Sequence, residues 1–168
     1  MNRYTIAVLV KNQFGVLNRV TSMFRRRQFN ISSLTVSETE SNEFSRITVK
    51  FDGDENGKQQ LVNQLYKLPD VCSIKEFTID NSVSCELLLI KMKNDINDRD
   101  EIKTAAEAFG AATIDYSKDS IVLRLTDDSR RIDDFIDLMR DFTILEICRT
   151  GTVSLEKGAM TIRQSINF

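Results

Sequence analysis

The chain has 168 residues with 25 acidic and 23 basic side chains, so its formal net charge of −2 gives no broad attraction to nucleic acid. It contains no histidine, the commonest general base and metal ligand, and its apolar runs, such as residues 87–90, are far shorter than the ~20 residues that span a bilayer. The N-terminus also lacks a signal-peptide pattern, so we expect a cytoplasmic protein. From the charge, the short apolar runs and the absence of histidine, we expect no nucleic-acid or membrane partner and neither catalytic nor metal-binding residues in this chain.

The first expected element is a near-continuous apolar strand at residues 4–10, which suggests a position inside a sheet with a neighbour on each side. A polar turn follows at residues 12–15. A helix is expected next, because apolar residues then recur at helical spacing as Val16, Leu17, Val20, Met23 and Phe24. A second strand should cover residues 31–38, and the polar residues 41–43 supply the turn into a third strand.

The third strand alternates between apolar and polar side chains. Ile47, Val49 and Phe51 are interleaved with residues 46, 48 and 50, so we expect one buried face and one face in contact with water. A helix with an apolar face should then run up to Pro69, and residues 71–79 should form a fourth strand. This β-α-β-β-α-β order is that of the split βαβ or ferredoxin-like fold.

The same order of elements recurs, less clearly, after a short linker at residues 80–82. Strands are expected at 83–92, 112–116, 120–126 and 143–149, with helices at 98–109 and around 132–139 and a tail beyond residue 151. We therefore predict an α+β protein with two ferredoxin-like βαββαβ domains, residues 1–80 and 81–168. Because a domain this small buries only about 60% of its unfolded surface, we also expect a homodimer joined through strands or helices.

The turn before the first helix is the candidate binding site. The first main-chain N–H groups of a helix have no internal acceptors and lie at its positive end, so a carboxylate is stabilised there. Gly15 would allow a ligand to approach the main chain, and Asn12 and Asn30 could hold the charged groups of an amino acid. The same residues could simply form a turn and a helix cap, and spacing alone leaves both interpretations open.

The remaining polar features have structural interpretations. Cys72, Cys85 and Cys148 show no CxxC spacing and lie in strand-like segments, which predicts buried free thiols. The basic residues 25–27 are expected to be a solvated helix end, since they complement the helix dipole and lack interleaved aromatic residues. The acidic pairs at 52/54, 127/128 and 133/134 lie near turns and helix starts, where carboxylates cap helices.

The N-terminal half resembles an ACT domain, the small-molecule regulatory module of amino-acid metabolism. More narrowly, Tyr4–Val20, Phe29–Val36 and Ser45–Val49 are similar to the regulatory small subunits of acetohydroxyacid synthase, also called acetolactate synthase. The combination of an Asn-x-x-Gly turn with the segment Asn-Ile-Ser-Ser-Leu-Thr-Val carries the resemblance. The similarity extends more loosely through residues 65–75, 111–115 and 149–151, and so spans nearly the whole chain.

The resemblance implies a non-catalytic subunit in branched-chain amino acid biosynthesis, which activates a catalytic large subunit and confers feedback inhibition by valine or a related amino acid. The effector would lie between the ACT domains of a homodimer, and the second domain would contribute to activation. No cofactor is expected in this chain, whereas thiamine diphosphate, Mg²⁺ and FAD are expected in the catalytic partner. Asn12 and Asn30 would hold the polar groups of the effector. The main chain at Gly15, Val16 and Leu17 would receive its carboxylate, while Leu34 and Val36 would offer apolar contacts from the partner protomer.

Two positions depart from the family pattern. Gln28 stands where the family commonly has glycine, so the bend after the helix could differ, and Phe14 replaces a small residue of the turn and could cover the pocket. Two other functions were weighed against this one. A free-standing ACT-domain amino-acid sensor or co-regulator would bind the ligand without an enzyme partner, and a small enzyme would need a nucleophile and a base that the sequence does not show.

Overall fold

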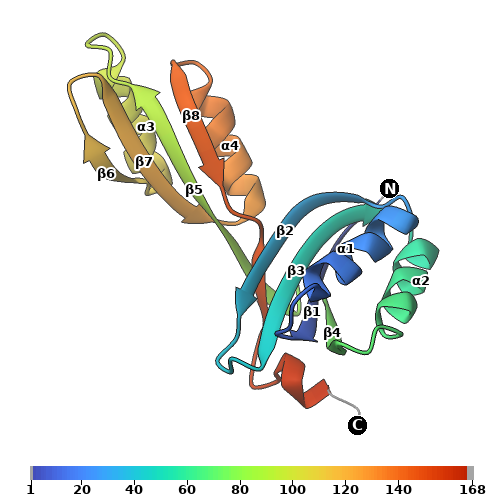
Figure 1. The fold of residues 1–168 in the computed structure, drawn as a ribbon. Helices are drawn as coiled ribbons and strands as arrows, with labels where there is room; N and C mark the ends of the chain where they lie inside the picture. The colour runs from blue at the N-terminus through green and yellow to red at the C-terminus, as the bar shows by residue number, and fades with distance from the viewer. Residues whose placement is uncertain (1, 166–168) are drawn as a thin grey trace. The chain divides into compact units, whose positions relative to one another are not determined.

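The computed structural model describes residues 2–165 and shows two antiparallel sheets with helices packed on them (Figure 1). The first sheet has the strand order β2-β3-β1-β4, and the second has the order β6-β7-β5-β8, with β9 paired to β5. The elements of the first half are β1 (Asn2–Lys11), α1 (Val16–Arg26), β2 (Asn30–Glu38), β3 (Phe44–Gly53), α2 (Glu55–Leu65) and β4 (Val71–Phe77). Those that follow are β5 (Ser82–Lys93), α3 (Arg99–Phe109), β6 (Ala112–Tyr116), β7 (Ser120–Asp127), α4 (Ser129–Met139), β8 (Ile144–Arg149), β9 (Val153–Glu156) and a 3-10 helix (Ile162–Ser165). The predicted α+β class, with two ferredoxin-like βαββαβ units, is confirmed.

The chain forms two compact units that do not follow simple sequence order. The first unit contains the residues up to Ser84 together with the described residues from Gly151 onward, and the second unit is Cys85–Thr150. The predicted division, at 80/81, assigned the tail to the second domain. In the structure the tail packs with the first unit, because β9 returns to pair with the start of β5, where the hydroxyl groups of Ser84 and Ser154 lie 2.7 Å apart.

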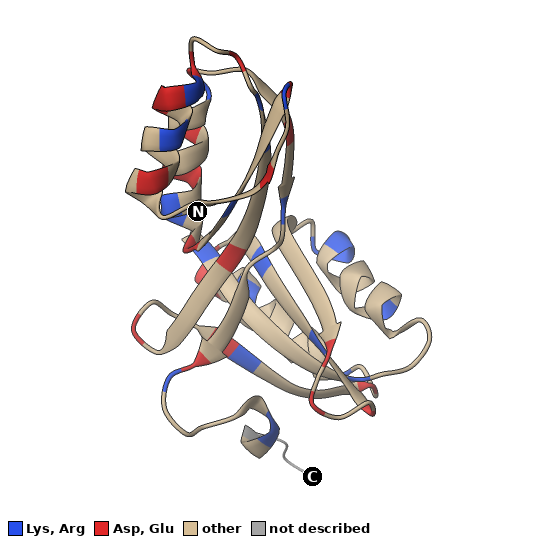
Figure 2. Ribbon diagram, turned by 90° about the vertical axis from the view of Figure 1, so that its left-hand side faces the viewer, with Lys and Arg blue, Asp and Glu red and all other residues tan. Residues whose placement is uncertain are grey.

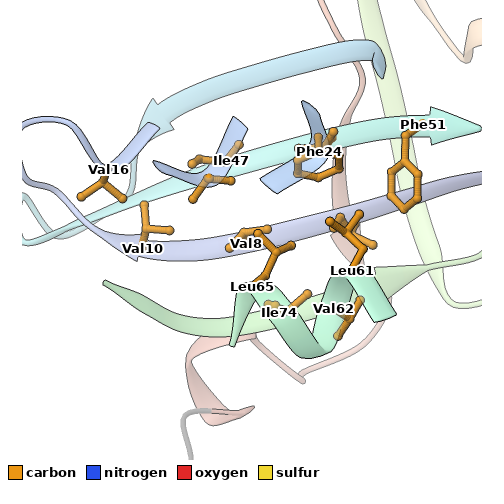
Figure 3. Packing of buried hydrophobic residues seen from close by; sticks show 13 residues of the cluster. Val8, Val10, Val16, Phe24, Ile47, Phe51, Leu61, Val62, Leu65 and Ile74 are labelled. Atoms are coloured by element: carbon orange, nitrogen blue, oxygen red, sulfur yellow. The ribbon is translucent and has the colours of Figure 1, made fainter. Parts of the chain in front are cut away.

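The core of the first unit lies between its sheet and the helices α1 and α2 (Figure 3). Strand β1 pairs with both β3 and β4, which confirms its predicted position inside the sheet. Phe51 is completely buried, and its ring meets those of Phe24 and Phe29 at centroid distances of 5.5 and 5.2 Å. The apolar residues predicted on one side of β3 are therefore the centre of this core.

The other face of the first sheet is also covered, contrary to the expectation of a wet face on β3. Thr48 is only 3% exposed, and Ala7 and Leu9, on the same face, are fully buried. The cover is the returning tail, whose Thr152 amide donates to Ser33 Oγ at 2.9 Å. A Cβ atom added at Gly151 would lie 2.3 Å from Thr35 Oγ1, so the tail approaches β2 at a distance that only glycine permits.

Helix α2 ends earlier than predicted. It stops at Leu65, and the amides of Lys67 and Leu68 then bond to the carbonyl groups three residues before them, in 3-10 fashion. Pro69 therefore follows a tightened turn and does not directly terminate the α-helix. The last turn of α1, by contrast, is basic and exposed as expected (Figure 2).

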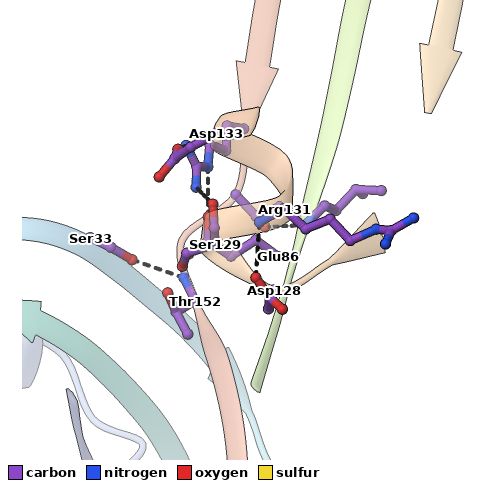
Figure 4. A network of polar contacts seen from close by, with 10 residues as sticks. Ser33, Glu86, Asp128, Ser129, Arg131, Asp133 and Thr152 are labelled. Atoms are coloured by element: carbon purple, nitrogen blue, oxygen red, sulfur yellow. Dashed lines mark hydrogen bonds and ion pairs between the residues drawn. The ribbon is translucent and has the colours of Figure 1, made fainter. Parts of the chain in front are cut away.

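The second unit has its own core under α3 and α4 and a polar network at one edge (Figure 4). Glu86 is only 4% exposed and receives hydrogen bonds from Arg149 Nε at 2.6 Å and from the Ser129 hydroxyl. A second nitrogen of Arg149 lies 2.6 Å from Asp133 Oδ1. Arg149 thus joins β8 to β5 and α4 within this unit.

The three cysteines are free thiols, as predicted, but they are not all buried. Cys72 and Cys85 are half-buried, whereas Cys148 is exposed, because it lies on a strand face that no other described element of its unit covers. Burial raises the pKa of the Cys72 thiol, which keeps it in the less reactive protonated form. Among residues 2–165, no helix is both long and apolar enough to cross a membrane.

Candidate functional site

The turn before α1 has the backbone geometry that the sequence suggested. Gly15 is the N-cap residue, with φ 80° and ψ −4°, in the left-handed region that glycine adopts without strain. The first turn of α1 contains no acidic residue, and no side chain caps it. The positive end of the helix is therefore open to an external carboxylate.

The main-chain amides at the opening of α1 are mostly unpaired. The amide of Val16 donates to Gln13 O at 3.3 Å, and that of Arg19 makes the first helical bond, to Gly15 O at 3.1 Å. Within the described residues, the amides of Gly15, Leu17 and Asn18 have no acceptor. Gly15 and Leu17 are among the predicted donors, whereas Asn18 was missed, although the rule that the opening amides of a helix lack partners would have included it.

In the side chain of Asn12, both the amide nitrogen and the amide oxygen are already hydrogen-bonded. Its Nδ2 donates to Glu38 Oε1 and to Asn42 O, both at 3.1 Å, and its Oδ1 accepts from Ser45 Oγ at 3.0 Å. These bonds tie the end of β1 to the ends of β2 and β3. A ligand could use only the remaining lone pair of Oδ1 without breaking them.

Asn30 lies at the opposite end of the sheet from Asn12 within one chain. It opposes Asp52 on β3, whereas Lys11, next to Asn12, opposes Phe44. Eight residues of strand separate those positions on β3, a distance of roughly 26 Å. The two asparagines cannot hold one small ligand in a single chain.

Val16, Leu17 and Val36 meet beside the turn, whereas Leu34 does not reach it. A hollow of about 100 Å³ is lined by Asn12, Val16, Leu17 and Val36, with five neighbours from β1, the turn and β3. Leu34, two positions from Val36 on the same face of β2, is 38% exposed. Phe14 is fully exposed and does not line the hollow, so it leaves the hollow uncovered.

Arg19 adds a positive charge that the sequence analysis did not single out. Its guanidinium pairs with Asp70 at 2.7 Å, and one of its nitrogens would lie 3.3 Å from a Cβ atom at Gly15. Asp70 is a buried carboxylate and partly neutralises this charge. The turn therefore combines unpaired main-chain amides and an arginine with an apolar hollow, which suits a small carboxylate with an aliphatic side chain.

Gln28 has a backbone conformation that glycine adopts more easily than other residues. Its φ is 57°, so it adopts the left-handed conformation despite having a side chain. The amide of Gln28 bonds to Arg25 O and that of Phe29 to Phe24 O, both at 3.1 Å, which is the Schellman pattern at a helix end. The substitution therefore leaves the bend intact and adds local strain.

The comparisons with known proteins cover both units. The family described as "AHAS small subunit-like ACT domain" matches residues 6–73, and the family described as "Small subunit of acetolactate synthase" matches residues 85–158. The chain is 43% identical over 156 residues to the probable acetolactate synthase small subunit of Archaeoglobus fulgidus, covering 93% of this chain and 98% of that one. It is 42% identical over 155 residues to the acetolactate synthase small subunit of Bacillus subtilis, covering 91% and 90%.

Among solved structures, the chain is similar to the crystal structure of the acetolactate synthase small subunit from Thermotoga maritima. The TM-score is 0.88 at 33% sequence identity, and the match covers 95% of this chain and all of that one. Sequence similarity and fold therefore agree across both units. The chain belongs to the acetolactate synthase small-subunit family.

Proposed function

We propose that the chain binds a branched-chain amino acid at the opening of α1 and thereby sets the activity of a catalytic large subunit of acetolactate synthase. The carboxylate of the effector accepts hydrogen bonds from the unpaired amides of Leu17 and Asn18, and its side chain packs in the hollow bounded by Val16 and Val36. These unpaired amides are the observation that carries the proposal. Valine is the preferred candidate, because the family resemblance favours it.

The hollow by itself holds only part of an amino acid, since sites for small ligands usually enclose about 300 Å³ or more. A second copy of the chain supplies the rest. Strand β2 is an edge strand, with β3 on one side and no partner on the other among the described residues, and its Leu34 and Val36 are exposed. Antiparallel pairing of two β2 strands would satisfy the open main-chain edge and cover both side chains.

This pairing also accounts for the separation of Asn12 and Asn30. In an antiparallel pair related by a twofold axis at Leu34, the start of one β2 lies beside the end of the other. Asn30 of the partner subunit would then approach Glu38, whose carboxylate already holds the side chain of Asn12. The two asparagines that lie roughly 26 Å apart in one chain would meet across the dimer.

Regulation follows if the effector prefers one of two arrangements of the paired ACT domains. A difference in binding free energy of about 1–3 kcal/mol between the two arrangements would give a useful feedback response. The large subunit, which would carry thiamine diphosphate, Mg²⁺ and FAD, senses the arrangement through contacts that include the second unit. The chain itself performs no chemistry in this scheme.

The test combines binding with reconstitution. Isothermal titration of the purified chain with valine, leucine and isoleucine should show two equivalent sites per pair of chains, one at each α1, and addition of the chain to a purified large subunit should raise its turnover and make it sensitive to the same amino acid. Binding of the amino acid without capture of the large subunit would instead indicate a free-standing sensor. Absence of binding by all three amino acids would refute the proposed site.

A further inference from the structure

A second cavity lies on the face of the first sheet that α1 and α2 do not cover. It has a volume of about 480 Å³ and lies between strands β3 and β4 and the returning tail. Arg46, Lys75 and Phe77 line it from the sheet, Glu40 lines it from the turn before β3, and residues 155–156 and 158–163 line it from the tail. It lies entirely within the first unit and shares no lining residue with the hollow beside Gly15.

Charged side chains occupy one part of this cavity and carry an excess of positive charge. Three cations and two carboxylates line it. Lys75 Nζ pairs with Glu156 Oε1 at 2.8 Å, and Arg163 Nε lies 3.0 Å from Glu40 Oε1. Among the described residues no carboxylate lies within ion-pair distance of Arg46, so one positive charge remains without a counterion in contact.

Arg46 is held in place, and only the Glu40 carboxylate, beyond ion-pair distance, partly offsets its charge. It donates to the main-chain oxygen of Ser154, and its guanidinium carbon lies 5.6 Å from the centre of the Phe77 ring. Burial lowers the pKa of Arg46, which shows that its charge is partly removed from water. A partly desolvated arginine stacked on an aromatic ring is a typical anchor for a carboxylate.

Arg163 provides further donors on the opposite wall. Its Nε and Nη2 groups are buried and donate no hydrogen bond within the described residues, although Nε is close to Glu40. Buried polar groups are usually hydrogen-bonded, and Nε already lies against the Glu40 carboxylate, so Nη2 is the nitrogen that indicates an acceptor the chain does not supply. The remaining lining is largely apolar, with Phe77, Leu155, Met160 and Ile162.

We propose that this cavity binds a small monocarboxylate with a short aliphatic chain. The carboxylate would lie between Arg46 and Arg163 and supply the missing counterion and acceptor, while the chain would pack against Phe77 and Met160. An anion fits better than a cation, because three cations face two carboxylates in the cavity and each carboxylate already has a cation within ion-pair distance, although Glu156 Oε2 accepts no hydrogen bond among the described residues. Bound ligand would connect the sheet to the tail, giving this family member a second effector site.

The probe for this site is isovalerate (3-methylbutanoate), with 3-methylbutylamine as the cation of matched shape. In titrations of the full-length protein, isovalerate should bind saturably and the amine should not. NMR of protein with methyl-labelled methionine locates the bound isovalerate, because Met160 lines the cavity, whereas Met23, Met92 and Met139 pack in the cores. We expect the NMR signal of Met160 to move and those three to stay unchanged.

Substitutions then separate this site from the one beside α1. Arg46→Met and Arg163→Met should each weaken isovalerate binding at least about tenfold, the loss expected for one charge-assisted hydrogen bond. Arg3→Met, which removes an exposed arginine paired with Asp52, is the matched control and should bind normally. Arg46→Met also removes the hydrogen bond to Ser154 O that holds the tail. Arg163→Met leaves that bond in place, so it tests the cavity independently.

Gly15→Asp should also leave isovalerate binding unchanged, whatever it does to amino-acid binding. The inference is overturned if isovalerate fails to saturate, if both arginine variants bind it normally, or if Gly15→Asp abolishes its binding. The last result would place the signal at the turn before α1. Failure of amino-acid binding with retention of isovalerate binding would refute only the function proposed above.

Discussion

Gly15 is the residue at which a single carboxylate should compete with the effector. A side chain there starts at the helix opening, 3.3 Å from a nitrogen of Arg19, so Gly15→Asp would place a carboxylate next to both the amides and the guanidinium. We expect feedback inhibition of the reconstituted enzyme to be lost, with activation retained. The measurement is turnover of the complex as a function of valine concentration.

Gly15→Asn is the matched control for that variant. Asparagine has the same shape as aspartate and tolerates the left-handed conformation, but it carries no charge. It should keep a measurable valine response. Equal loss of inhibition in both variants would point to a steric effect and count against a carboxylate-binding role for the turn.

Gln28 offers a test of stability at the other end of α1. Because its φ of 57° is unfavourable for a residue with a Cβ atom, Gln28→Gly should raise the free energy of unfolding by about 1 kcal/mol. That corresponds to an increase in Tm of about 2–4 °C for a chain of this size, measurable by calorimetry. Arg27→Gly, at a φ of −98°, should instead lower the stability, and a rise in both would contradict the explanation.

The separation of Asn12 and Asn30 could have been inferred from the predicted fold. Asn12 follows β1 and Asn30 begins β2, and both strands are antiparallel to β3. Strands β1 and β2 therefore run in the same direction, so the end of β1 and the start of β2 lie at opposite ends of the sheet. The residue types were therefore identified from sequence, whereas their use in one site needed the topology and a second chain.

Strand β2 is the element on which the proposed dimer depends. Leu34 lies at its midpoint and is 38% exposed, so a lysine there would place two positive charges next to the twofold axis. We expect Leu34→Lys to convert the dimer to monomers in analytical ultracentrifugation. Ile114→Lys, on the edge strand β6 of the other unit and 48% exposed, is the control that should stay dimeric. A dimeric Leu34→Lys protein would exclude pairing through β2.

The ion pair between Arg149 and Glu86 should matter for the stability of the second unit. Arg149→Met would leave the Glu86 carboxylate, 4% exposed, without its cation, and breaking a buried pair in this way costs about 3 kcal/mol. Arg140→Met removes an exposed pair with Asp137 and should cost less than about 0.5 kcal/mol. Urea denaturation followed by circular dichroism measures both, and similar losses would contradict a structural role for the buried pair.

Local patterns predicted the elements well where one face of each meets a core. The helical spacing of Val16, Val20 and Phe24 and the alternation of Ile47, Val49 and Phe51 gave α1 and β3 correctly. The four-residue strand β9 was missed, because so short a segment has no clear period and is held by partners far away in sequence. The same long-range contact explains why Thr48 was wrongly expected to be exposed.

At the scale of the whole molecule, the first unit is assembled from two separate stretches of chain. Residues up to Ser84 form the sheet and its helices, and the described residues from Gly151 onward cover the opposite face. Ala7 and Leu9 are fully buried on that face, and Lys75 pairs there with Glu156 at 2.8 Å. The second unit is thus inserted between the two stretches of the first. When the first unit folds, it must bring together two chain segments that the whole second unit separates in sequence.

This arrangement predicts that residues 1–84 alone are less stable than the same residues with their tail. A chain in which Ser84 is joined to Gly151 by a short Gly-Ser linker should fold, because Ser84 and Ser154 already lie side by side with their hydroxyl oxygens 2.7 Å apart. Without the tail, the side chains of Ala7 and Leu9 return to water, and full exposure of one leucine alone costs about 1.5–3 kcal/mol. Urea denaturation should therefore give a midpoint for the linked chain well above that of residues 1–84, and the shorter chain should associate through its uncovered face in ultracentrifugation. Equal midpoints would show that the tail adds nothing to the first unit, and the cavity between sheet and tail would then lack a stable wall.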